Sequence, residues 1–148
     1  MNMNYEERDT YGMYKDRPNG GGVGALHEGG HNGLMGADTL IGTDVHNEQA
    51  ENLGEIKEIM LDMRSGRIEY AVLSFGGFLG MGEKLFAVPW SALKLDADHK
   101  YFVLNVDKER LKNAPGFAQD NWPNMMDPTW TTGIHNYYGT KSDTARVL

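Results

Sequence analysis

The first candidate for chemistry is a glycine-rich loop at residues 75–84, with the sequence Phe-Gly-Gly-Phe-Leu-Gly-Met-Gly-Glu-Lys. Gly77 and Gly82 have the spacing of the outer glycines in a phosphate-binding G-x-x-x-x-G-K-[ST] loop. Glu83 stands before Lys84, no serine or threonine follows, and the next residues have the pattern of a strand instead of a helix. Because a carboxylate would lie where the phosphate must bind, we expect a hairpin connection and no nucleotide site.

Two further groups of residues have the types that metal sites and acid–base catalysis use. His27 and His31 flank a glutamate and two glycines, but the glycines oppose a helix and the order H-E-x-x-H is absent. Asp62 and Glu69 are expected to face each other across a hairpin that contains arginines, which favours solvated ion pairs over catalysis. The chain has no cysteine, so thiolate metal sites and disulfides are excluded. We expect no catalytic residue, no metal and no cofactor, and a protein that is not an enzyme.

The charge and the hydropathy of the chain limit its partners. The 148 residues carry a formal net charge of −7, whereas proteins that neutralise phosphates need a basic face, so direct binding of nucleic acid is disfavoured. The first residues lack the basic and apolar regions of a secretory signal. The longest uncharged stretch, residues 70–82, is shorter than the roughly 20 apolar residues of a membrane-spanning helix. We therefore expect a cytoplasmic protein with no transmembrane segment.

The composition divides the chain into four segments. Residues 1–37 are polar and glycine-rich, and we expect a disordered arm because they cannot bury enough apolar surface. Residues 38–116 contain short β-type runs joined by short turns, which predicts a mostly β fold, a small closed or partly open β-barrel of about six strands. Residues 117–139 combine aromatic residues with prolines but lack helical or strand periodicity. They are expected to form an irregular extension that packs on the barrel or on a second copy, and residues 140–148 a frayed tail.

Local signals refine the barrel. Ile56 is out of phase with the alternating apolar residues that follow it, which indicates a β-bulge that curves the sheet. Pro89 cannot donate a hydrogen bond to a sheet, so its strand must end there or lie at an edge. Asp107 is a good N-cap for a short helix at residues 108–112. The third strand is apolar on both faces and is expected to be central. Strands are predicted at residues 40–46, 53–63, 68–75, 84–88, 93–95 and 101–106.

Several short motifs together resemble the PRC-barrel family over roughly residues 38–112. The motifs include Leu40-Ile41-Gly42, Leu53-Gly54-Glu55-Ile56, Gly66-Arg67-Ile68 and Val88-Pro89-Trp90-Ser91-Ala92-Leu93. That family includes the soluble domain of the photosynthetic reaction-centre H subunit and the C-terminal domain of the ribosome maturation factor. The resemblance implies a small barrel, and two alternative roles follow from it by analogy. One is an accessory role in photosynthetic or other electron transport at a membrane surface, and the other is assistance to ribosome maturation or RNA processing through protein contacts.

Our first hypothesis is a non-catalytic interaction or adaptor module that binds protein partners and self-associates, with a dimer as the favoured state. The candidate contact residues are the large apolar side chains of the glycine loop and of the extension: Phe78, Leu79, Met81, Trp122 and Trp130. In the loop these side chains either cover the mouth of the barrel or form a contact patch. Trp90 is expected to close one end of the barrel. The residues assigned a structural role are Gly76, Gly77, Gly80, Gly82, Pro89 and Trp90.

Overall fold

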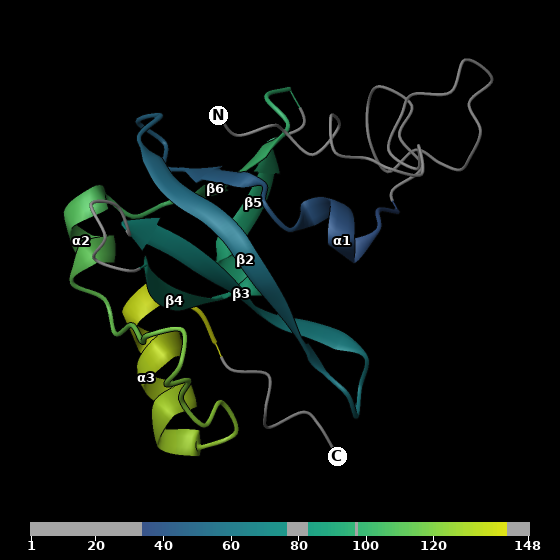
Figure 1. Cartoon of the computed structure of the whole chain (residues 1–148), viewed down its shortest axis with the longest axis vertical. Helices are drawn as coiled ribbons and strands as arrows, with labels where there is room; N and C mark the ends of the chain where they lie inside the picture. Colours follow the sequence, from purple (N-terminus) through teal and green to yellow (C-terminus); the bar gives the residue numbers. More distant parts are fainter. Residues whose placement is uncertain (1–33, 77–82, 97, 142–148) are drawn as a thin grey trace.

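One curled sheet of six strands forms the body of the molecule (Figure 1). The computed structural model describes residues 34–76, 83–96 and 98–141. The strands are β1 (Asp44–His46), β2 (Asn52–Asp62), β3 (Arg67–Gly76), β4 (Glu83–Pro89), β5 (Leu93–Asp96) and β6 (Tyr101–Leu104). They lie in the order β4-β3-β2-β1-β6-β5, so that β4 and β5 are the two edges of this sheet. All neighbours are antiparallel except β1 and β6, which run parallel. The sheet is a curled half-barrel, which agrees with the predicted closed or partly open barrel of about six strands.

A bulge in β2 bends the long β2–β3 hairpin. Ile56 pairs with Leu73 and Glu58 pairs with Val72, so that Lys57 is the extra residue between them. A second shift of register follows further along the same pair of strands. An extra residue on one strand raises the local twist and turns the sheet. The bulge expected from the phase of Ile56 is confirmed.

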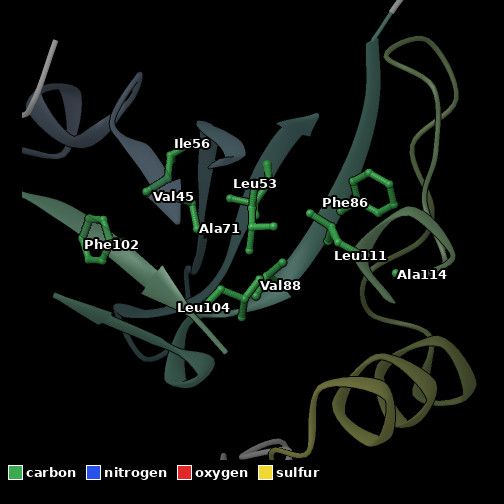
Figure 2. Close-up of a cluster of buried hydrophobic side chains, with 11 residues drawn as sticks. Val45, Leu53, Ile56, Ala71, Phe86, Val88, Phe102, Leu104, Leu111 and Ala114 are labelled. Atoms are coloured by element: carbon green, nitrogen blue, oxygen red, sulfur yellow. The ribbon is translucent and has the colours of Figure 1, made fainter. Parts of the chain in front are cut away.

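The concave face of the half-barrel holds the main core. Ala71 and Leu73 point from β3 into this cluster, which also receives Phe86 from β4 and Phe102 from β6. In Figure 2, Phe102 lies at one side of this cluster, and Phe86, Leu111 and Ala114 lie at the other. Burial of such side chains is the dominant favourable term in folding, about 1.5–3 kcal/mol for each large one.

The opposite face of β3 and β4 is covered by a helix, α3 (Pro128–Tyr138). Tyr70, whose side chain alternates with that of Ala71, packs there with Ala87 and with Ile134 of α3. This second cluster explains why β3 is apolar on both phases, since one side faces the half-barrel and the other faces the helix. The central position expected for this strand is confirmed.

Short elements complete the fold and hold α3 in place. A helical turn, α1 (Ala37–Leu40), precedes β1, a 3₁₀ turn, η1 (Trp90–Ala92), joins the two edge strands, and α2 (Lys108–Lys112) follows β6. Asp107 caps α2 by accepting a hydrogen bond from the Arg110 N–H at 2.7 Å, as expected. Arg110 donates to the Tyr137 carbonyl at 2.6 Å, and the Tyr137 hydroxyl donates to the Arg110 carbonyl. This reciprocal pair ties the end of α3 to α2.

The C-terminal extension differs from the expectation of an irregular segment. Residues 117–127 are irregular, although Phe117 exchanges two backbone hydrogen bonds of 2.9 Å with Leu85 at the edge of β4. The following eleven residues are the helix α3. Asp127 caps this helix through the Thr129 N–H, a proline occupies its first position, and Gly139 ends it in the left-handed conformation with φ 72°. These are the usual start and stop signals of a helix.

Two strand boundaries differ from the prediction by two residues or more, while the other strand ends agree to within one residue. The expected first strand at residues 40–46 begins only at Asp44, because Leu40 ends the helical turn α1 and the Thr43 N–H bonds back to its carbonyl. The last strand ends at Leu104 instead of residue 106, because the Val106 N–H bonds to the Leu104 carbonyl in a tight turn. Pro89 ends β4, which is an edge strand, so both alternatives given for this proline apply.

Candidate functional site

Much of the predicted glycine loop lies outside the described residues. Phe78, Leu79 and Met81 belong to that part of the chain, as do Gly77, Gly80 and Gly82. The same holds for His27 and His31, for residues 1–33 of the predicted arm and for residues 142–148 of the predicted tail. Gly76, which ends β3, has φ 86°, a conformation that glycine adopts without strain. The contact role of the loop stays a prediction.

The three tryptophans occupy different environments. Trp90 is half-buried and packs on the main core, with its ring tilted against Phe102 at a centroid distance of 5.6 Å. Trp130 of α3 meets Tyr70 edge-on at 5.3 Å, so that it helps to hold the helix on the sheet. Trp122 is 38% exposed, and its indole N–H donates to the Gln119 carbonyl at 2.7 Å. Of the two tail tryptophans, Trp122 is the more exposed, although its ring also packs against Phe117 at 5.0 Å. A contact role for either one stays a prediction.

A groove lies between the far end of the β2–β3 hairpin and the start of α3. Both elements extend toward the same end of the molecule (Figure 1). The groove has a volume of about 290 Å³. One wall is formed by the hairpin and the other by the loop before α3 and the first turns of the helix. We call it the methionine groove, and its lining residues are Met60, Leu61, Asp62, Arg64, Glu69, Tyr70, Met125, Met126, Pro128, Thr131 and Thr132.

Large apolar side chains around this groove are exposed. Leu61 is 51% exposed and Met126 is 68% exposed, and both line the groove. Met63, in the turn between β2 and β3, is 86% exposed and stands between two lining residues in the sequence. Gathered apolar side chains of this kind mark interaction sites, whereas single ones are normal on any surface. Sequence reasoning missed this cluster, for which the only signal was two pairs of methionines, 60/63 and 125/126, far apart in the chain.

Charged groups stand at the rim of the methionine groove. The Asp62 carboxylate accepts the Arg64 N–H at 2.9 Å, and the Arg64 Nε lies 3.5 Å from the same oxygen. The backbone hydrogen bond from Arg64 holds the pKa of Asp62 below its ordinary value. Asp62 is therefore ionised at neutral pH. The predicted ion pairing at this hairpin is present for Asp62 and Arg64. The expectation that Asp62 faces Glu69 is wrong, because Asp62 pairs with Arg67 and Glu69 is the extra residue at the second shift of register. Glu69 contributes to the groove lining.

A buried polar contact links Tyr70, which lines the groove, to α3. Tyr70 is buried, and its hydroxyl lies 3.5 Å from His135 Nε2. The other ring nitrogen of His135 lies 2.7 Å from the Thr140 hydroxyl. Burial raises the pKa of the Tyr70 hydroxyl, so this group stays protonated under physiological conditions. These contacts lie within the packed face of α3, and they position the helix that forms one wall.

The match to a protein family agrees with the curled six-stranded sheet. The profile of the PRC-barrel domain matches residues 32–111, more than half of the chain. The chain belongs to the PRC-barrel family. A search of curated proteins found no match. The PRC-barrel match ends within α2, so it covers the hairpin wall of the methionine groove but not α3 or the loop before it. One wall of the groove is therefore part of the PRC-barrel domain, and the other is an addition to it.

Histidine and carboxylate side chains elsewhere in the described ranges are arranged as follows. Within residues 34–76, 83–96 and 98–141, no three His, Cys, Asp or Glu side chains are grouped so that they could hold a metal ion. His99 pairs with Asp96 at 2.9 Å and stacks with Tyr101, which in turn stacks with His46 at 4.0 Å on the β1–β6 pair. Over the same described ranges, no helix is long and apolar enough to cross a bilayer.

Proposed function

We propose that this chain is a non-catalytic PRC-barrel module that binds other proteins through the methionine groove and associates with itself. The observation that carries the proposal is the gathering of exposed Leu61, Met63 and Met126 around one groove. The PRC-barrel match is consistent with a module that has no catalytic role. The net charge of −7 favours protein over nucleic acid as the partner.

The physical properties of the groove suit an apolar side chain from a partner protein. Methionine side chains are unbranched and polarisable, so they adapt to partners of different shape. An apolar side chain that enters a groove between Met60 and Met125 loses its contact with water, and the binding energy of interfaces is concentrated in such buried anchors. Asp62 and Arg64 at the rim supply the polar border that interface cores usually have.

The test removes the apolar surface without touching the core. Leu61→Ser combined with Met126→Ser changes two exposed side chains of the groove, and Leu95→Ser is the control, because Leu95 is an exposed apolar residue of β5. Each protein is immobilised and exposed to native lysate, and the bound proteins are quantified by mass spectrometry. We expect a set of proteins that binds the wild type and the control equally and is reduced at least tenfold on the groove variant.

Two outcomes would count against the groove as the binding surface. One is an equal set of bound proteins on all three baits, and the other is an equal loss on the control and the groove variant. The predicted loop contacts are tested in the same assay with Phe78, Leu79 and Met81 changed together to serine. A loss confined to that variant would assign binding to the loop instead of the groove.

A further inference from the structure

We infer that a second copy of this chain occupies the methionine groove, with two copies paired about a twofold axis beside their β2–β3 hairpins. This pairing rests on the proposed function of the groove as a protein-binding surface and names its occupant. A twofold interface uses the same patch on both subunits, so the patch must complement itself in shape and must not repel itself by its charge. The hairpin end of the molecule has both properties.

The shape is self-complementary because a projecting side chain stands beside a hollow. Met63 is 86% exposed at the turn of the hairpin, and it is the most exposed large apolar side chain in the described part of the chain. Its sequence neighbours Asp62 and Arg64 line the groove, so Met63 lies at the groove's edge. When two copies meet about a twofold axis, Met63 of each copy enters the groove of the other and packs against Met126. Each copy thus supplies one projecting methionine side chain and one groove that receives the partner's.

The charge at this end also allows a second copy to approach. The chain as a whole carries a net charge of −7, which opposes the approach of a second copy over most of the surface. The hairpin end is nearly balanced, because Asp62, Glu69 and Asp127 stand against Arg64 and Arg67, which leaves a net charge of −1. Two such nearly neutral patches approach each other without the repulsion that the acidic remainder of the surface exerts. The hairpin end is therefore a surface on which a second copy is not repelled.

The first test measures self-association by sedimentation equilibrium over a series of protein concentrations. Met63→Glu places a charge on the projecting side chain, Met126→Glu places one on the groove wall, and Leu95→Glu adds the same charge on β5 as a control. All three positions are exposed, so the fold is retained, which circular dichroism verifies. We expect a dimer for the wild type and the control, and a dissociation constant at least tenfold higher for Met63→Glu and for Met126→Glu.

A monomeric wild type at millimolar concentration would overturn the pairing, and so would a dimer that both groove variants leave intact. The outcome also separates this inference from the proposed function. If the wild type is monomeric but the Leu61→Ser, Met126→Ser variant still loses its bound proteins, the groove binds other proteins and the second copy is wrong. If the wild type dimerises through the groove and no other protein is captured, the second copy is its only supported partner.

A second test locates the contact, and the absence of cysteine from the chain makes it clean. Copies with Met63→Cys are mixed with copies with Met126→Cys under mild oxidation, because only side chains that meet across the interface can form a disulfide. We expect a crosslinked pair that contains one copy of each kind. A mixture of Leu95→Cys with Met126→Cys is the control. No crosslink in the first mixture, or the same yield in both, would contradict the insertion of Met63.

Discussion

Replacing Gly54 with alanine gives the sharpest test of how the hairpin that forms one wall of the groove is built. Gly54 lies in β2 with φ 107°, where the strand passes very close to β3. A Cβ added at this position would lie 2.1 Å from the Ser74 carbonyl oxygen and 3.3 Å from the Phe75 Cα. Both are backbone atoms of the neighbouring strand, so no side-chain rotation can relieve the overlap.

The expected cost has two parts. A non-glycine residue at this φ is strained by about 1–3 kcal/mol. Shifting packed backbone to relieve the overlap with Ser74 adds about 1–3 kcal/mol, by analogy with overpacked cores. The sum is about 2–6 kcal/mol, against a total stability of about 5–15 kcal/mol for a domain.

The control is Gly66→Ala in the turn between β2 and β3. Gly66 also has a positive φ, 78°, but a Cβ there would meet nothing within 4 Å. This variant therefore carries only the backbone strain of about 1–2 kcal/mol. Urea unfolding, followed by tryptophan fluorescence at a concentration where all proteins share one oligomeric state, gives both values. A Gly54→Ala variant no less stable than Gly66→Ala would refute the close approach of β2 to β3.

Three further predictions concern other parts of the molecule. Ile134→Ala should lower the free energy of unfolding by about 2–5 kcal/mol in urea titrations, because this side chain is 2% exposed and fills the contact between α3 and the sheet. A smaller loss than that of the exposed control Thr132→Ala would contradict this prediction. Trp90→Ala should cost about 3 kcal/mol, since the ring is half-buried on the core, and an unchanged thermal midpoint would mean that Trp90 is not part of that core. The pKa of Glu83 lies below its ordinary value of 4.5, mainly because Lys57 donates a hydrogen bond to its carboxylate. The ionised Glu83 therefore contributes its full share to the stability of the fold above pH 4.5, and this share is lost as the pH falls through the lowered pKa. The stability difference between the wild type and Glu83→Gln should therefore shrink from pH 7 to pH 3, and a constant difference in urea titrations at the two pH values would contradict the pairing.

The parts of the fold that were predicted from the sequence depend on local rules. The phase of Ile56 indicated the bulge, Asp107 marked the start of α2, and Pro89 marked the edge strand, because each signal acts within a few residues of itself. The family resemblance supplied the arrangement of these elements. It agrees with the PRC-barrel match to residues 32–111.

The helix α3 was missed although its signals were present. Asp127, Pro128 and Gly139 are start and stop residues, and the buried residues Thr131 and Ile134 have helical spacing, with His135 beside them. The aromatic and proline content of the whole segment, taken as one piece, concealed a helix of eleven residues. Start and stop signals are therefore more informative here than the average composition.

The methionine groove was missed for a different reason. It exists only because α3 docks beside the hairpin, and that docking depends on Ile134 meeting Tyr70 and Ala87 on the second face of the sheet. No periodicity links Met60 to Met125, so their proximity is a property of the folded chain alone. The predicted contacts in the glycine loop remain predictions, since they lie outside the described residues.

The parallel pairing of β1 with β6 has a consequence for how the chain folds. Strands β1 to β4 pair in sequence order, and β5 and β6 form a hairpin, so both parts can form from local contacts. The pairing that joins them connects Val45 with Phe102, which are 57 residues apart. Distant contacts form slowly because the loop between them must close first. We therefore expect the concave core to close only after β6 has been synthesised, with the docking of α3 onto Tyr70, across a longer separation, as a later step.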